Sequence, residues 1–236
     1  MPYTKALPEV TVSAYTPRKK RFFLKYLAHF LLFFENVKAK GSFLDNKRVI
    51  VAAAPHQSGK DEYLMVLMIL ALDIDVCYLS AKWTMRRIPN PFIKPADIDK
   101  QGIPWPLGWL QEIAFKKFGA IPVDRKMNSG QYDSVVKELT QRDNFLLIIT
   151  PEGRFDATRF RSSFLYLAKE LEAEVMPVQI DYENHKLQFL NSLDLEGSEE
   201  EVIQRLRLCF DGIKGKKNRF KACLLYTSPS PRDVSS

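Results

Sequence analysis

The sequence predicts a single α/β domain with a largely parallel mixed sheet flanked by helices, preceded by an amphipathic helix. Short apolar runs alternate with helical runs along most of the chain, which is the pattern of strand–helix units in a parallel sheet. The length of 236 residues suits one domain with a sizeable core. Hydrophobic residues make up 46% of the chain and charged residues 27%, a composition typical of a globular protein and not of a disordered one.

Two N-terminal segments precede the domain. Residues 1–17 are expected to be irregular and exposed. Residues 18–40 are expected to form an interfacial amphipathic helix, because a basic cluster at 18–21 adjoins the aromatic-rich run 22–34. As a helix this run reaches about 20 Å, too short to span a bilayer but suited to its headgroup plane; simple packing on the core is the alternative. Its polar positions fall on one narrow stripe: Lys25, His29 and Asn36.

The elements of the domain, residues 41–222, follow from periodicity. Apolar runs predict strands at 48–54, 75–80, 144–150, 175–181 and 186–190. Helical spacing predicts helices at 61–72, 107–118, 131–141, 161–171 and 199–210. Residues 86–106 contain five prolines and are expected to form a long loop, and residues 119–125 a strand-like turn.

Composition limits the classes of function. The formal net charge of +7 favours an anionic partner, such as nucleic acid, an anionic membrane or a phosphorylated small molecule. No RNA- or DNA-binding motif is present, so a membrane surface is expected and nucleic acid is not. The three cysteines lack disulfide or metal-site spacing, which favours a reducing compartment and no metal. Residues 223–236 resemble a translated sequencing adapter, with an ordinary disordered tail as the alternative.

The first candidate motif directly follows the strand predicted at 48–54. His56 and Asp61 stand five positions apart across a loop that enters a helix. The carboxylate can then orient one imidazole nitrogen while the other takes a proton from a hydroxyl. Ser58 is expected to cap the helix or to bind the substrate. A phosphate-binding loop at 58–60 is disfavoured because the upstream glycine is absent, and a purely structural histidine is the remaining alternative.

The second motif runs from Gly119 to Arg125, after the helix predicted at 107–118. An arginine side chain is a fixed cation whose planar fork suits a phosphate group. The alternative is a surface ion pair between Arg125 and the adjacent Asp124.

The third and fourth motifs also lie where predicted strands present their ends, the usual place for ligands in α/β sheets. Glu152 and Gly153 form a sharp turn after an apolar strand, followed by Arg154. This carboxylate can accept hydrogen bonds from hydroxyls of a substrate, pair with Arg125, or simply belong to a plain turn. Pro177 lies inside an apolar strand, which indicates an edge strand or a ligand-facing end.

Together, and in this order, the four motifs resemble those of the lysophospholipid (1-acylglycerol-3-phosphate) acyltransferase family, over about residues 45–190. The resemblance implies the glycerolipid acyltransferase fold and transfer of a fatty acyl group from acyl-CoA or acyl carrier protein to a lysophospholipid hydroxyl. It implies that His56 is the general base and Asp61 its orienting partner. It places Pro177 in the acyl-donor region. The substrate-binding residues that it implies are Ser58, Gly119, Arg125, Glu152, Gly153 and Arg154.

The third motif departs from the family pattern, since Arg154 and Phe155 stand where threonine and arginine are usual. A non-enzymatic membrane-surface lipid-binding protein that retains the fold is therefore the alternative function. For the enzyme, direct attack is the simplest mechanism, because a thiolate leaves readily (thiol pKa about 8.5). No cofactor is expected beyond the acyl donor, and main-chain N–H groups near Gly59 are candidates for the oxyanion site. The expected location is peripheral, on the cytoplasmic face of a membrane.

Overall fold

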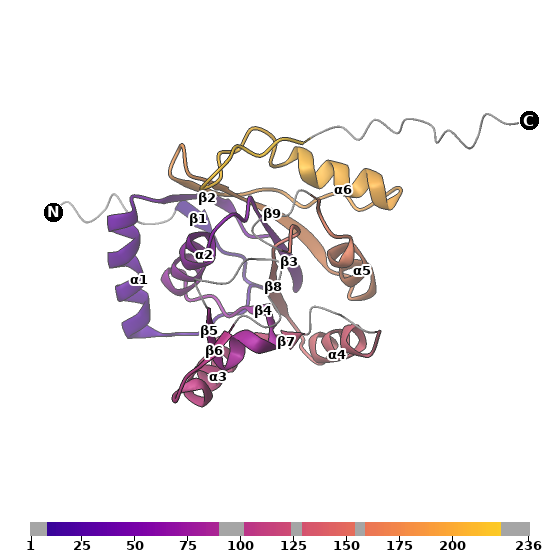
Figure 1. Ribbon diagram of the computed structural model, residues 1–236. Helices are drawn as coiled ribbons and strands as arrows, with labels where there is room; N and C mark the ends of the chain where they lie inside the picture. Colours follow the sequence, from indigo (N-terminus) through magenta and orange to yellow (C-terminus); the bar gives the residue numbers. More distant parts are fainter. Residues whose placement is uncertain (1–8, 90–101, 124–128, 154–158, 223–236) are drawn as a thin grey trace, which may run out of the picture.

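The computed structural model describes residues 9–89, 102–123, 129–153 and 159–222 (Figure 1). Its centre is an eight-stranded sheet with the strand order β1-β2-β10-β9-β3-β8-β4-β7. Neighbouring strands of this sheet run parallel except β9 and β10, which are antiparallel. The predicted α/β class with a largely parallel mixed sheet is confirmed. The strands are β1 (Glu9–Thr11), β2 (Lys38–Ser42), β3 (Arg48–Ala54), β4 (Cys77–Ala81), β7 (Ala120–Val123), β8 (Phe145–Ile149), β9 (Glu174–Asp181) and β10 (Lys186–Phe189).

Helices cover both faces of the sheet, and the central strand β3 shows why (Figure 1). Its sequence RVIVAAA is apolar after the first residue, as expected for a strand buried on both sides. Alternate side chains from Val49 to Ala53 join the core under α1 and α2. Those from Ile50 to Ala54 join the core under α4, α5 and α6. The helices are α1 (Phe22–Glu35), α2 (Gly59–Ala71), α3 (Gly108–Lys117), α4 (Ser129–Thr140), α5 (Ser163–Glu170) and α6 (Glu199–Leu208).

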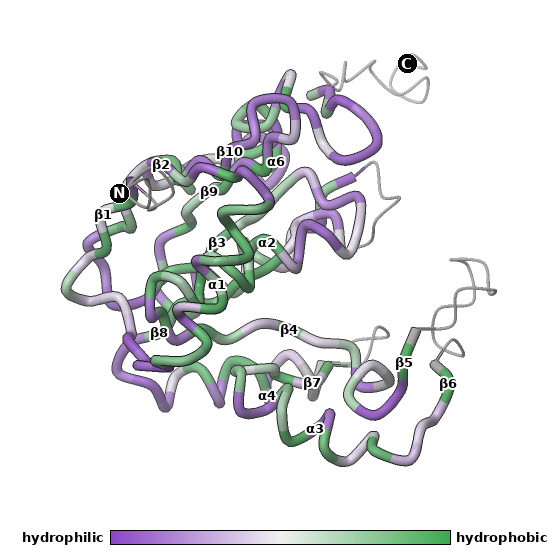
Figure 2. The backbone as a smooth tube through the Cα atoms, turned by 90° about the vertical axis from the view of Figure 1, so that its left-hand side faces the viewer, coloured by the Kyte–Doolittle hydropathy of each residue, from purple (hydrophilic) through white to green (hydrophobic). Residues whose placement is uncertain are grey.

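The helix α1 is mostly hydrophobic along its length (Figure 2). Lys25 and His29 of its polar stripe are half-buried, whereas Asn36 and the aromatic side chains are exposed. Ala28 and Leu32 are its buried residues and pack in the core beside α2. On the same side, Lys25 Nζ lies 2.6 Å from Asp73 Oδ2. Burial and the nearby Lys25 lower the pKa of His29, which is half-buried. The exposed residues of the helix are Phe22, Phe23, Tyr26, Leu27, Phe30, Phe33 and Phe34.

The interfacial segment predicted at 18–40 contains a shorter helix. The helix ends at Glu35 because Asn36 adopts a left-handed conformation, with φ of 51°. Residues 38–40 belong to β2 instead. Within the described residues, no helix has both the length and the apolar character needed to cross a membrane.

Residues 9–11, expected to be irregular, form the edge strand β1. This strand pairs in parallel with β2, with Val10 opposite Gly41. Val10 and Val12 pack against the core. Three residues are too short a run for period-two alternation to stand out in the sequence, which is why the strand was not predicted.

The proline-rich segment 86–106, expected to be a loop, contains a two-stranded antiparallel ribbon. Its strands β5 (Arg87–Pro89) and β6 (Gly102–Pro104) pair with Ile88 opposite Ile103. Prolines at strand ends are compatible with such a ribbon because its outer edges need no ladder hydrogen bonds. A short 3-10 helix, Lys82–Met85, connects β4 to this ribbon.

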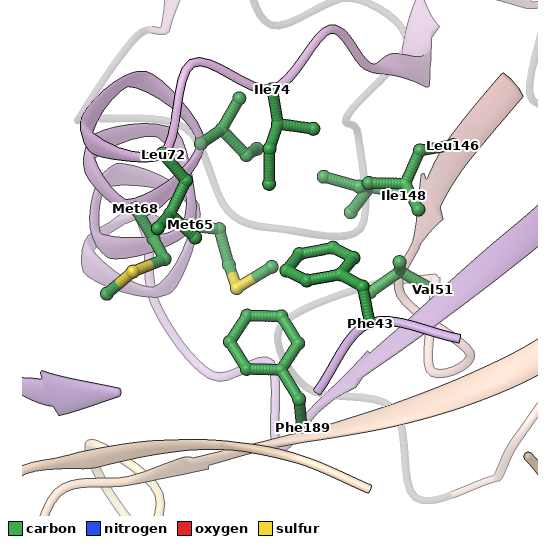
Figure 3. Close-up of a pocket in the computed structure, with 10 residues that line it drawn as sticks. Phe43, Val51, Met65, Met68, Leu72, Ile74, Leu146, Ile148 and Phe189 are labelled. Carbon is green, nitrogen blue, oxygen red and sulfur yellow. The ribbon is translucent and has the colours of Figure 1, made fainter. Parts of the chain in front are cut away.

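A small apolar cavity lies between α2 and the sheet (Figure 3). Its volume is about 10 Å³, roughly the room that one water molecule needs. Phe43, Met65 and Phe189 are among the side chains that line it. A void of this size is a packing defect of the core and cannot hold a fatty acyl chain.

Candidate active site

The first motif lies where β3 ends at Ala54 and α2 begins at Gly59. Ser58 is the N-cap residue, and Asp61 completes a capping box with it. The main-chain N–H groups of Gln57 and Ser58 donate to Asp61 Oδ2 at 2.6 Å and 2.8 Å. The loop is therefore folded around one carboxylate, which fixes the backbone next to His56.

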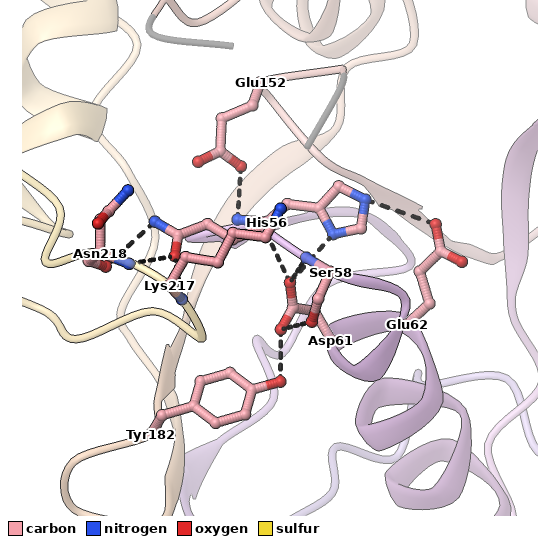
Figure 4. A network of polar contacts seen from close by, with 9 residues as sticks. His56, Ser58, Asp61, Glu62, Glu152, Tyr182, Lys217 and Asn218 are labelled. Carbon is pink, nitrogen blue, oxygen red and sulfur yellow. Dashed lines mark hydrogen bonds and ion pairs between the residues drawn. The ribbon is translucent and has the colours of Figure 1, made fainter. Parts of the chain in front are cut away.

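The carboxylate of Asp61 is the buried centre of a polar network (Figure 4). Tyr182 Oη donates to Asp61 Oδ1 at 2.5 Å, and Ser58 Oγ donates to the same oxygen at 3.3 Å. Burial acts to raise the pKa of Asp61, but the adjacent His56 and the hydrogen bonds from Tyr182 and the loop outweigh it and lower the pKa. Asp61 is therefore ionised at neutral pH.

The imidazole of His56 lies between two carboxylates of α2 (Figure 4). Its Nδ1 is 3.6 Å from Asp61 Oδ2, and its Nε2 is 3.4 Å from Glu62 Oε1. The His56 side chain is only 6% exposed, whereas that of Glu62 is 65% exposed. Burial acts to lower the pKa of His56, but the two carboxylates outweigh it and raise the pKa to about 9. The structure thus brings the predicted pair together, with Asp61 on the inner nitrogen and the outer nitrogen toward the exposed side.

Glu152 of the third motif lies behind His56. The residue is 4% exposed, and its Oε2 accepts the main-chain N–H of His56 at 2.7 Å. Burial raises the pKa of Glu152 to about 7, although the His56 N–H and the His56 charge act in the opposite direction. This carboxylate holds the histidine loop, and its expected contact with a substrate or with Arg125 stays a prediction.

Gly153 makes the turn that presents Glu152. Its φ of +67° is a conformation that favours glycine. Its N–H donates to the Thr150 carbonyl at 2.9 Å. A Cβ at this position would lie 2.8 Å from the side chain of Arg161. The backbone conformation and the close Arg161 side chain therefore explain a glycine at this position without any ligand.

Glu62 and Tyr182 belong to the site although the sequence did not single them out. Glu62 directly follows Asp61, where an acidic residue in a first helical turn is already explained by the helix dipole. Tyr182 follows β9 and is 121 positions away from Asp61 in the chain. No local pattern connects two residues at that separation, so only the fold could reveal the contact.

A C-terminal loop, residues 214–218, closes the network on the other side of the motif. Gln57 Oε1 accepts the main-chain N–H groups of Lys217 and Asn218 at 2.8 Å and 2.9 Å. The main-chain N–H of Tyr182 donates to the Lys214 carbonyl at 2.8 Å. Lys216 Nζ lies 5.4 Å from the centroid of the Tyr182 ring, within the range of a cation–π contact. This basic loop buttresses both the histidine loop and the tyrosine that holds Asp61.

The second motif is described only in part. Gly119 has a φ of +89°, and a Cβ there would lie 1.8 Å from the Val76 carbonyl oxygen. The glycine thus permits a close backbone approach to the start of β4. Arg125, like Arg154 of the third motif and the tail 223–236, lies outside the described residues.

Pro177 is buried inside β9, opposite Ala52 of β3. Since β9 lies between β10 and β3, the prediction of an edge strand is wrong. The ladder to β10 ends at Val178, and the Pro177 carbonyl accepts the Leu190 N–H at 3.0 Å. The N and carbonyl of one strand residue face the same neighbour, so the missing N–H costs no bond to β3. Because Pro177 is opposite Ala52, which precedes His56 by four residues, Pro177 lies about 13 Å from His56 along the strand direction.

The chemistry that this arrangement offers is proton transfer. His56 has one nitrogen held by a buried carboxylate and one nitrogen facing outward, which suits a general base. Nothing in the described structure lies within 4 Å of a Cβ built on Gly59, so the space beside this residue at the start of α2 is open. Across the described ranges, no group of three or more His, Cys, Asp and Glu residues is placed to hold a metal ion.

No protein-family profile matches the chain. No curated protein matches its sequence either. Among solved structures, the fold is similar to the crystal structure of the 1-acyl-sn-glycerophosphate (LPA) acyltransferase PlsC from Thermotoga maritima. The match has a TM-score of 0.49 and 17% sequence identity, and it covers 79% of this chain and 75% of the other chain.

Proposed function

We propose that the chain is an O-acyltransferase that moves a fatty acyl group from a thioester donor to a hydroxyl of a lysophospholipid such as 1-acylglycerol-3-phosphate. The donor is acyl-CoA or acyl carrier protein. The observation that carries the proposal is the orientation of His56, with Nδ1 3.6 Å from the buried Asp61 carboxylate and Nε2 on the exposed side. The order of the four sequence motifs supports the same reaction.

The proposed reaction is a direct attack with one tetrahedral intermediate. The acceptor hydroxyl gives its proton to Nε2 of neutral His56 while its oxygen bonds to the thioester carbonyl carbon. The carbonyl electrons move to oxygen, and N–H groups at the open start of α2 near Gly59 are the proposed donors to that oxyanion. When the carbonyl re-forms, the C–S bond breaks and the departing thiolate takes the proton from the imidazolium. Asp61 stays ionised throughout and stabilises the imidazolium.

The acceptor phosphate needs cationic partners. Arg125 and Arg154 are the proposed partners, since a guanidinium binds phosphate in a fork geometry. Glu152 and Ser58 are assigned to positioning, because Glu152 bonds the main chain of His56 and Ser58 caps α2. Pro177 remains the proposed marker of the acyl-donor region.

We place the enzyme on an anionic membrane surface, on the cytoplasmic side where both thioester donors occur. The aromatic side of α1 is exposed, and exposed apolar patches of this kind mark interaction surfaces. The basic cluster 18–21 links α1 to α3, since Lys19 Nζ donates to the Lys117 carbonyl at 3.3 Å and Arg21 lies over the Phe118 ring. The helix α3 adds further exposed apolar side chains: Trp109, Leu110 and Ile113. Two apolar patches joined by basic residues suit an interface with anionic lipid headgroups.

The test is thiol release from a long-chain acyl-CoA by the purified chain with detergent-dispersed lysophosphatidate, beside His56→Ala. We expect acceptor-dependent release that His56→Ala abolishes while the variant keeps its thermal unfolding transition. Release without acceptor would indicate a thioesterase and would contradict the proposal. Absence of release with every lysolipid and with an acyl carrier protein donor, while vesicle binding persists, would favour the non-enzymatic lipid-binding alternative.

A further inference from the structure

The outer nitrogen of His56 is met by a carboxylate in this structure. Glu62 Oε1 lies 3.4 Å from Nε2, the nitrogen that a general base has to present to the substrate (Figure 4). The Glu62 side chain is 65% exposed, so it can rotate toward solvent without disturbing the core. Asp61, in contrast, is fixed by the loop N–H groups and by Tyr182. The two carboxylates of the site therefore differ in freedom: one is locked and one can move.

We propose that Glu62 is a positioning residue that holds the outer nitrogen of His56 until the acceptor hydroxyl takes the place of its carboxylate. The inference rests on the proposed function, in which that hydroxyl has to come within hydrogen-bond reach of Nε2, roughly 2.6–3.2 Å. The nitrogen has a single hydrogen-bonding direction in the ring plane. Glu62 and the hydroxyl therefore compete for the same place.

This competition couples acceptor binding to the activation of the base. Among the residues that the structure describes, charged groups that face His56 include Asp61 and Glu62 from α2 and Glu152 from the turn after β8. Tyr182 acts through Asp61. Burial, and after it the charge of Glu62, raises the pKa of Tyr78 of β4. With both carboxylates in place the pKa of His56 is about 9, so most of the ring is protonated at neutral pH. Departure of Glu62 removes one of the two stabilising charges and favours the neutral base.

The first experiment compares the pH dependence of two kinetic constants in the wild type and in Glu62→Gln. The constant kcat/KM reports the free enzyme, whereas kcat reports the complex. We expect kcat/KM of the wild type to rise through a midpoint near 9, and Glu62→Gln to lower that midpoint by about one pH unit. The kcat profile should move much less, because Glu62 has already left the nitrogen in the complex.

A second readout needs no catalysis. The chain has three histidines, so the NMR signal of His56 is identified by its loss in His56→Ala. Titration of the lipid-free protein should give a lower His56 pKa in Glu62→Gln than in the wild type. Glu200→Gln is the matched control, since Glu200 is also an exposed acidic residue in the first turn of a helix, and it should leave the His56 pKa unchanged.

These measurements separate failure of the inference from failure of the proposed function. A His56 pKa that Glu62→Gln does not change would overturn the inference, and the acyltransferase proposal would stand. Equal shifts of the kcat and kcat/KM profiles would also overturn it, because Glu62 would then remain on the nitrogen in the complex. A lowered NMR pKa in a protein without acyl transfer to any acceptor would remove the proposed function and the acceptor-displacement role with it.

Discussion

The helices α1 and α2 pack on the same face of the sheet, yet they bury very different shares of their apolar side chains. The helix α2 buries apolar residues over most of its length, Leu64, Leu67 and Met68 among them, and it encloses its polar start in a hydrogen-bonded loop. The helix α1 buries only Ala28 and Leu32 and leaves seven large apolar side chains exposed. Its Lys25 faces inward, to Asp73 at the end of α2.

Folding accounts for α2 but not for α1. The core and the Asp61 network explain most residues of α2, and its first turn holds the two carboxylates on either side of His56. The exposed face of α1 lacks such an explanation. Full burial of a side chain of this size stabilises a fold by about 1.5–3 kcal/mol, and the exposed side chains of α1 do not contribute this energy. A helix face with so many exposed apolar side chains indicates that this face contacts something outside the folded chain. We propose that α2 serves catalysis and that the outer side of α1 contacts lipid, and both parts of this proposal can be tested.

The largest expected effect is at the start of α2. Asp61→Asn keeps the size of the side chain but removes the charge that orients and stabilises the His56 imidazolium. We expect kcat/KM for acceptor-dependent thiol release to fall by about 10³-fold or more. Asp73→Asn is the matched control at the other end of α2, where the aspartate pairs with Lys25, and it should stay within about threefold of the wild type. Activity of Asp61→Asn within tenfold of the wild type would remove Asp61 from the mechanism.

The outer side of α1 should carry the next largest effect, on membrane binding. A triple variant with Phe23, Phe30 and Phe34 changed to Ser should lose about 100-fold or more in affinity for anionic phospholipid vesicles. Its free energy of unfolding should change by less than about 1 kcal/mol, because these side chains are exposed. Co-sedimentation with vesicles and urea denaturation measure the two quantities.

The inner side of the same helix provides the opposite control. Leu32 is 2% exposed, so Leu32→Ala should lower the free energy of unfolding by about 2–5 kcal/mol. Vesicle binding of the folded fraction should remain. If the triple variant were the unstable one and bound vesicles normally, α1 would be packed the other way around and its assignment to lipid would be lost.

The features that could be predicted from the sequence depend on residues close together in the chain. The apolar run of β3 and the period of α2 predicted both elements, and the capping box that brings His56 and Asp61 together lies within a few residues. The polar stripe of α1 was visible too, but periodicity cannot tell which side of a helix faces the protein. That choice depends on contacts with distant residues, such as that of Lys25 with Asp73 in the turn after another helix.

The rest of the site depends on contacts between distant parts of the chain. Tyr182 reaches Asp61 from 121 positions away, and Gln57 meets the 214–218 loop from about 160. Glu152 was found by its motif, but its partner is the main chain of His56, and any residue type supplies a main-chain N–H. Pro177 in a central strand was mispredicted because its tolerance depends on where the β10 ladder ends.

A smaller effect is expected on the pH dependence of stability. The folded pKa of His56, about 9, lies above its unfolded value of about 6.5. Its contribution to stability is therefore complete below pH 6.5 and is lost as the pH rises toward 9. Glu152, with a pKa of about 7, loses its contribution earlier, as the pH rises from about 4.5. Asp61 acts in the other sense, since its lowered pKa stabilises the fold above about pH 4.

Stability should thus be greatest near pH 5 and fall by roughly 3–6 kcal/mol by pH 9. The share due to Glu62 is the lesser part of the His56 contribution, about one unit of the His56 pKa, because that side chain is 65% exposed and screened by solvent. Urea denaturation across this range measures the change, and His56→Ala should flatten the part between pH 6.5 and 9. A wild-type curve that rises over that interval would contradict the ion pairs around His56.

The smallest effect is expected at Tyr182, which supports α2 from β9. Tyr182→Phe keeps the ring and its contact with Lys216 but removes the hydroxyl that donates to Asp61 at 2.5 Å. We expect kcat/KM to fall by about tenfold and the free energy of unfolding by about 1 kcal/mol, because a buried charged acceptor loses one donor. Tyr166→Phe is the matched control, since it removes a bond of equal length, to Glu199, on the exposed surface, and it should change neither quantity. Equal effects of the two variants would mean that Asp61 is held by its own loop alone, so that α2 would build the catalytic pair without help from the rest of the fold.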